Sequence, residues 1–176
     1  MAEERKDAVT LGGNPVTLIG PALKAGQPAP DFTAVNTALE SVQLGTARRG
    51  ALVIAAIPSL DTTVCDREIR RFNLEAAQLP GVEIWTLSMD LPFAQKRWCG
   101  AAGVDVVKTL SDFRDRAFGS AYGVLIKNGT LAGLHTRAVF VIGRDGRLAH
   151  VEYVKEIASE PDYAAALAAA KNAAEA

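Results

Sequence analysis

The chain has 176 residues, of which 49% are hydrophobic and 22% are charged, so it is long enough to bury a full core. Its net charge of −1 at pH 7 gives no basic footprint for nucleic-acid binding. No apolar run is long enough to span a bilayer, and no secretory signal follows the charged start. We therefore expect one domain over residues 1–176, with 1–7 and 171–176 disordered or frayed, no nucleic-acid or membrane partner, and a cytoplasmic location.

Strand and helix patterns alternate along the chain and predict an α/β fold of three layers. In chain order we expect strands at 9–11, 16–19, 32–35, 42–44, 52–57, 82–88, 106–110, 139–142 and 148–154. We expect helices at 63–79, 93–102 and 113–122, and a last one from 163 to about 170. The first two strands form an N-terminal hairpin, and Asp145-Gly146 is the turn of the last hairpin.

Cys65 lies where a strand gives way to a helix. The apolar run 51–57 predicts a buried strand, and Pro58 ends it because proline has no N–H to donate to a sheet. Thr62 and Thr63 then supply hydroxyls that can cap a helix, and apolar residues recur at helical spacing from Cys65 onward. Cys65 is therefore predicted in the first turn of a helix, facing the core.

This position alone does not make a thiol reactive. Lowering a thiol pKa from about 8.5 to about 6 requires about 3.4 kcal/mol of selective thiolate stabilisation. A helix N-terminus supplies only about 0.3–2 kcal/mol, and apolar neighbours oppose the charge. A cation must reach the sulfur if Cys65 is a nucleophile. Taken alone, a cysteine on an apolar helix stripe is more often a small core residue.

Pro58, Thr62 and Cys65 form the pattern Pro-x-x-x-Thr-x-x-Cys, which resembles the active-site signature of peroxiredoxins. The similarity covers nearly the whole chain and narrows to the bacterial thiol peroxidases of the atypical two-cysteine type. Further matching segments are Gly13-Asn14-Pro15-Val16-Thr17, Asp90-Leu91-Pro92-Phe93-Ala94-Gln95, Arg97-Trp98-Cys99-Gly100, Thr109-Leu110-Ser111, Ala121-Tyr122-Gly123-Val124, Arg137-Ala138-Val139 and Glu160-Pro161-Asp162-Tyr163. The resemblance implies a thioredoxin-like (peroxiredoxin) three-layer sandwich with an N-terminal β-hairpin.

The resemblance also implies roles for five residues. Cys65 is the peroxidatic nucleophile that becomes a sulfenic acid, Thr62 hydrogen-bonds the sulfur and the peroxide, and Pro58 shields the pocket from water. Arg137 is the cation beside the sulfur, and Cys99 is the resolving thiol that forms an intramolecular disulfide with Cys65. The implied substrates are hydrogen peroxide and alkyl hydroperoxides, the implied reductant is thioredoxin, and the implied assembly is a homodimer without cofactor or metal.

These roles agree with the chemistry. Peroxide cleavage needs a thiolate, a fixed line of attack and donors that face the developing charge. A nearby second thiol offers a reversible route away from irreversible overoxidation. Cys99 falls in a different predicted helix from Cys65, whereas a disulfide needs Cα atoms about 4.4–6.8 Å apart. We therefore predict that one or both helices partly unwind between the reduced and oxidised forms.

Two other classes of function stay open. A thioredoxin-fold thiol–disulfide oxidoreductase typically carries a Cys-x-x-Cys unit, whereas this chain has Thr62 three positions before Cys65. A non-enzymatic redox sensor would use Cys65 oxidation only as a signal to a partner. Fast peroxide consumption separates the first class from a peroxidase, and sustained turnover with a thioredoxin system separates the second.

The remaining polar residues suggest no further site. His135 and His150 lack metal-ligand spacing to the cysteines, so we expect both to have ordinary polar surface roles. Arg67, Arg70 and Arg71 alternate with acidic residues along the helix after Cys65, among them Glu68. We interpret this face as solvated rather than as a phosphate site.

Overall fold

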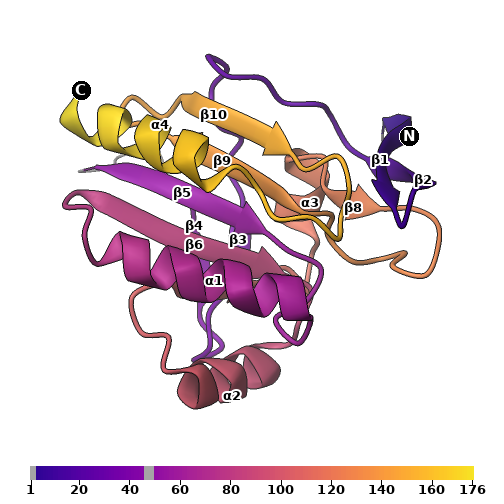
Figure 1. Ribbon diagram of the computed structural model, residues 1–176, viewed down its shortest axis with the longest axis horizontal. Coiled ribbons are helices and arrows are strands. Elements are labelled where there is room, and N and C mark those ends of the chain that lie inside the picture. The colour runs from indigo at the N-terminus through magenta and orange to yellow at the C-terminus, as the bar shows by residue number, and fades with distance from the viewer. Residues whose placement is uncertain (1–2, 46–49) are drawn as a thin grey trace.

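The computed structural model describes residues 3–45 and 50–176 (Figure 1). The helices are α1 (Thr63–Ala76), α2 (Pro92–Ala102), α3 (Ala117–Ala121) and α4 (Tyr163–Glu175). The strands are β1 (Glu4–Leu11), β2 (Asn14–Ile19), β3 (Thr33–Val35), β4 (Ser41–Gln43), β5 (Ala51–Ala56), β6 (Val82–Ser88), β7 (Lys108–Ser111), β8 (Leu125–Ile126), β9 (Ala138–Ile142) and β10 (Leu148–Tyr153). None of these helices is long and apolar enough to cross a membrane.

A seven-stranded sheet runs through the molecule in the order β10-β9-β5-β6-β7-β3-β4. Strands β5, β6 and β7 are parallel, and the other neighbours pair antiparallel. Every residue of β5 is buried, as a central strand covered on both faces requires. The carboxyl end of β5 leads directly into the segment that carries Cys65.

Helices cover both faces of this sheet (Figure 1). Val53, Ala55 and Ile57 pack on one face with residues of α1, α2 and α4. The alternate residues of β5 pack on the other face with Phe118 and Tyr122, in and just after α3. The three layers predicted from the sequence are therefore confirmed, and α1 is held between the sheet and solvent with Cys65 facing inward.

The N-terminal hairpin predicted from the sequence forms a second sheet, with the order β1-β2-β8. Its turn contains Gly12 and Gly13, both at positive φ (57° and 80°), which glycine adopts without a steric cost. The Glu156 carboxylate accepts hydrogen bonds from the N–H groups of both glycines and from the Thr10 hydroxyl. These bonds, with the Thr10 hydroxyl contributing most, lower the pKa of Glu156 to about 2.

Replacing Glu156 by glutamine should lower the melting temperature near neutral pH, because an amide accepts these hydrogen bonds less strongly than a carboxylate. Since the folded-state pKa of about 2 lies below the ordinary glutamate value of 4.5, which applies to the unfolded chain, the carboxylate stabilises the fold fully above pH 4.5. This stability is lost as the pH falls toward 2. Thermal unfolding of both proteins should therefore show a difference that shrinks with acidification, and a pH-independent difference would contradict this account.

The structure differs from the sequence-based expectations in four segments. The helix expected at 113–122 begins only at Ala117, because the Asp112 carboxylate accepts the N–H groups of Phe118 and Gly119 and so caps the shorter helix. Short strand β8 was not predicted. Residues 4–7 lie in β1, and α4 continues through 171–175, so neither segment is disordered or frayed; residues 1–2 lie outside the described residues.

Candidate active site

Cys65 lies in the first turn of α1 and is fully buried, as predicted. Arg137 immediately precedes β9, a direct neighbour of β5, and its Nη2 donates a hydrogen bond to Cys65 Sγ at 3.3 Å. The same guanidinium donates from Nη1 to the Glu68 carboxylate and from Nε to the Ile157 carbonyl. The cation required at the sulfur is therefore present, and three partners fix its orientation.

The electrostatics of this cluster follow from its burial. Burial opposes the positive charge of Arg137, but Glu68 and Cys65 outweigh that effect and raise the pKa of the guanidinium above its ordinary value. Burial raises the pKa of Glu68 to about 7, although Arg137 acts in the opposite direction. Arg137 thus stays charged, and Glu68 titrates near neutral pH.

Glu68 also belongs to this site, and the sequence-based expectation for it is wrong. It was expected on the solvated face of the helix, but its side chain is fully buried. Cys65, Glu68, Ile69 and Phe72 share one stripe of α1 at steps of three and four, so the spacing itself pointed inward. The arginines of this helix, Arg67, Arg70 and Arg71, are exposed as expected.

Pro58 and Thr62 flank the thiol in the chain. Pro58 is buried directly beyond β5. Thr62 is the N-cap residue of α1, but its side chain makes no capping hydrogen bond, which corrects the expectation for its hydroxyl. Thr62 Oγ1 donates instead to the Ser59 carbonyl at 3.2 Å, and within the described residues no hydrogen bond joins it to Cys65. The hydroxyl is exposed at the entrance to the helix.

Asp90 holds the loop between β5 and α1 in place, a role that no sequence pattern indicated. Its carboxylate accepts hydrogen bonds from the Ser59 hydroxyl, the Leu60 N–H and the Ser88 hydroxyl, each at 2.8 Å. The loop before Cys65 is therefore tied to the end of β6 and to the start of the segment that carries α2. Only the fold brings these groups together, since Asp90 lies about thirty positions after the loop.

Cys99 lies near the carboxyl end of α2 and is half-buried, and both cysteines are free thiols. Its Sγ is 3.4 Å from Thr109 Oγ1 on β7. It also lines a surface pocket of about 430 Å³, together with Lys96, Lys108 and Thr109. The structure thus places the second thiol beside an open pocket and against β7, whereas Arg137, which contacts Cys65, adjoins β9.

Neither histidine belongs to this cluster. His135 was expected at the surface but is fully buried, with Nε2 at 3.0 Å from the Asp112 carboxylate. His150 is half-buried, with Nε2 at 3.9 Å from the Glu152 carboxylate. No group of histidine, cysteine and acidic side chains suited to a metal ion occurs among residues 3–45 and 50–176.

Comparison with known proteins gives the family. The family model described as Redoxin matches residues 24–167. The chain belongs to the redoxin family. Two bacterial proteins named thiol peroxidase resemble this redoxin over most of their length. The one from Halalkalibacterium halodurans is 49% identical over 94% of this chain and 98% of its own. The one from Bacillus subtilis is 48% identical over 93% and 96%.

Solved structures agree with this family. The crystal structure of a peroxiredoxin-like protein from Aquifex aeolicus superimposes on this redoxin with a TM-score of 0.90 and 44% identity, covering 94% of this chain and 96% of that one. The thiol peroxidase from Chromobacterium violaceum, at 21% identity and a TM-score of 0.82, shares the fold over 89% of this chain and 91% of its own. The predicted thioredoxin-like peroxiredoxin fold is confirmed, and the redoxin is a thiol-dependent peroxidase of the peroxiredoxin type.

Proposed function

We propose that this redoxin reduces hydrogen peroxide and organic hydroperoxides to water and alcohols, with Cys65 as the nucleophile and Cys99 as the resolving thiol. The observation that carries the proposal is the hydrogen bond from Arg137 Nη2 to Cys65 Sγ at 3.3 Å, inside a buried site. A permanently charged guanidinium at the sulfur favours the thiolate, and its N–H groups can also donate hydrogen bonds to peroxide oxygens. The similarity to thiol peroxidases supports the same chemistry.

In the first step, the Cys65 thiolate attacks the terminal oxygen of the peroxide. A sulfur–oxygen bond forms, the oxygen–oxygen bond breaks, and the leaving oxygen takes up a proton to become water or an alcohol. The sulfur becomes a sulfenic acid, two electrons more oxidised than the thiolate. We assign Thr62 to binding the incoming peroxide through its exposed hydroxyl, and Pro58 to keeping water from the sulfur.

In the second step, Cys99 attacks the Cys65 sulfenic acid, water leaves, and an intramolecular disulfide forms. The partners of the two sulfurs are far apart: Arg137 adjoins β9 and Thr109 lies on β7, with β5 and β6 between those strands. Three inter-strand spacings amount to roughly 14 Å. This separation supports the prediction that the helices partly unwind.

Helix ends are the segments we expect to unwind. Cys65 lies in the first turn of α1 and Cys99 in the last turn of α2. The side chain of the N-cap residue, Thr62, makes no capping hydrogen bond to α1, so the first turn of the helix lacks a common source of stabilisation. Unwinding one end turn of each helix would disturb little of the packed face between α1 and the sheet.

We further propose that thioredoxin reduces the disulfide and that the enzyme is a cytoplasmic homodimer. The half-buried Cys99 beside an open pocket supports attack by a protein thiol from outside. Leu91 and Phe93 are 50% and 66% exposed at the start of α2, which supports an intermolecular contact there. A cytosolic setting permits a transient catalytic disulfide of this kind.

Mass spectrometry after one equivalent of hydrogen peroxide, quenched within seconds and without reductant, tests the two-cysteine cycle. We expect the loss of both thiol hydrogens and a cross-linked peptide that contains Cys65 and Cys99. The Cys99→Ser variant should instead gain one oxygen atom at Cys65. An unchanged mass would show that Cys65 is not an activated thiolate, and a cross-link between two chains would contradict an intramolecular disulfide.

A further inference from the structure

The buried site holds two acidic groups and one cation. Cys65 and Glu68 are fully buried and Arg137 is 2% exposed. The Arg137 guanidinium contacts both acidic groups: Nη1 donates a hydrogen bond to the Glu68 carboxylate, and Nη2 donates one to Cys65 Sγ. If both acids ionised, the cluster would carry one uncompensated negative charge away from water. A buried charge without a partner is strongly unfavourable, so both ionisations together are disfavoured.

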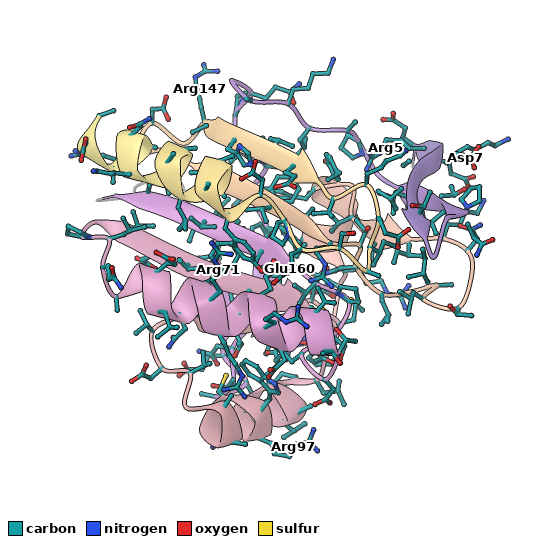
Figure 2. All side chains as sticks on the ribbon, in the orientation of Figure 1. Arg5, Asp7, Arg71, Arg97, Arg147 and Glu160 are labelled. Atoms are coloured by element: carbon teal, nitrogen blue, oxygen red, sulfur yellow. The ribbon has the colours of Figure 1, made fainter. Side chains whose placement is uncertain are left out.

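The other acidic groups near Glu68 also disfavour its ionisation. Glu152 on β10 and Glu160, just before α4, both act to raise the pKa of Glu68. The Tyr163 hydroxyl, which donates to Glu160, lies near enough to interact electrostatically with Glu68. The guanidinium of Arg71 lies over the Tyr163 ring, 4.0 Å from its centroid. Figure 2 shows Arg71 and Glu160 between α1 and α4.

The contacts of Glu68 itself are asymmetric. One carboxylate oxygen, Oε2, is bonded to Arg137, whereas Oε1 is buried and has no hydrogen-bond partner among the described residues. An unpartnered oxygen is costly when it carries half of a negative charge and less costly in a neutral acid. These contacts therefore favour the protonated form of the Glu68 carboxyl over part of the neutral pH range.

We propose that Cys65 and Glu68 share one proton across Arg137, so that the Cys65 thiolate forms while Glu68 is a neutral carboxylic acid. Glu68 is then a positioning residue: it acts through the guanidinium and leaves the full charge of Arg137 to the thiolate. This inference rests on the proposed role of Cys65 as the nucleophile.

The proton balance of the peroxide step follows. Before attack the site contains thiolate, guanidinium and carboxylic acid, and is neutral. When sulfur gains oxygen and becomes a sulfenic acid, Arg137 loses its anionic partner at sulfur, and Glu68 ionises to replace it. Glu68 releases one proton, and the leaving oxygen takes up one proton. The site is again neutral, and the peroxide step needs no net proton from solution.

Infrared titration of the carboxylic-acid C=O stretch in the reduced protein tests the shared proton, and Glu68→Gln identifies the band. We expect Glu68 to keep its proton to a pH about 2–3 units higher in the wild type than in Cys65→Ser, because two anions on one guanidinium, about 4–6 Å apart, repel by that amount at an effective dielectric constant of about 20. The control Glu75→Gln removes another carboxyl of α1 and should leave the band unchanged.

Coincident midpoints in the wild type and Cys65→Ser would overturn the shared proton, even with a fully active enzyme. Peroxide consumption, measured separately on the same wild-type sample, distinguishes the two claims. An inactive wild type would refute the proposed role of Cys65, whatever the titration shows. Serine is close in size to cysteine, so Cys65→Ser should keep the fold. The midpoints are compared between the wild type and Cys65→Ser alone, and Glu68→Gln serves only to identify the band.

Discussion

Replacing Cys65 by serine should abolish peroxide reduction, with a rate loss on the order of 10⁴-fold or more, because a hydroxyl is scarcely ionised at neutral pH and is a far weaker nucleophile. Sulfur and oxygen differ little in size, so the buried first turn of α1 should keep its packing. Peroxide consumption under excess dithiol reductant measures the effect. Circular dichroism and the melting temperature should stay close to those of the wild type.

Cys99→Ser is the matched control, since it removes the other thiol of the chain. It should consume one equivalent of peroxide at close to the wild-type rate and then stop unless a small thiol reduces the sulfenic acid. An equal loss of the peroxide-consumption rate in both variants during the first turnover would contradict the distinct roles assigned to the two cysteines. Full activity of Cys65→Ser would place the nucleophile elsewhere.

Replacing Arg137 by methionine should lower the rate constant for peroxide reduction by about 10²–10³-fold, the usual effect of removing a donor that faces developing negative charge. The rate constant of Arg137→Lys should lie between those of Arg137→Met and the wild type. Lysine keeps the charge but lacks the guanidinium donors that reach Cys65, Glu68 and Ile157. Single-turnover oxidation of Cys65, followed at several pH values, measures these rates.

Arg137→Met should also destabilise the fold, and more so at higher pH. Without the guanidinium, the pKa of Glu68 rises further above its wild-type value of about 7. Because the unfolded carboxyl ionises at lower pH than the folded one, stability is full below the unfolded pKa and declines as the pH rises through the folded pKa. The double variant Arg137→Met/Glu68→Gln should recover stability at high pH but not activity. Recovery of both would show that the arginine acts only as a structural counterion.

The position of Cys65 could be read from local sequence. An apolar strand, a proline that ends it, and an apolar helical stripe fix the thiol in the first turn of α1, and each signal lies within about twenty residues. The resemblance to thiol peroxidases added Arg137 and Cys99. Arg137 then lies where the chemistry requires it, with Nη2 on the sulfur.

Long-range pairing explains what sequence reasoning missed. A glutamate on a helix is ordinarily assigned to solvent, and Glu68 is buried only because Arg137, 69 positions later, is its partner. His135 is buried because it meets Asp112, whose carboxylate also shortens α3. The helical spacing of Glu68 pointed inward, but no local pattern shows which charge would accompany it or marks His135 as buried, since the partner of each comes from a distant strand or loop.

The distance along the chain between the sulfur and its cation has a consequence for biosynthesis. Arg137 follows Cys65 by 72 positions, so a ribosome adding about 5–20 residues per second makes the cation about 4–14 s after the thiol. The last helix, α4, which packs in the same cluster as Cys65, is made later still. A nascent chain therefore carries an ordinary cysteine, and the reactivity that we propose for Cys65 arises only when the whole sheet has assembled.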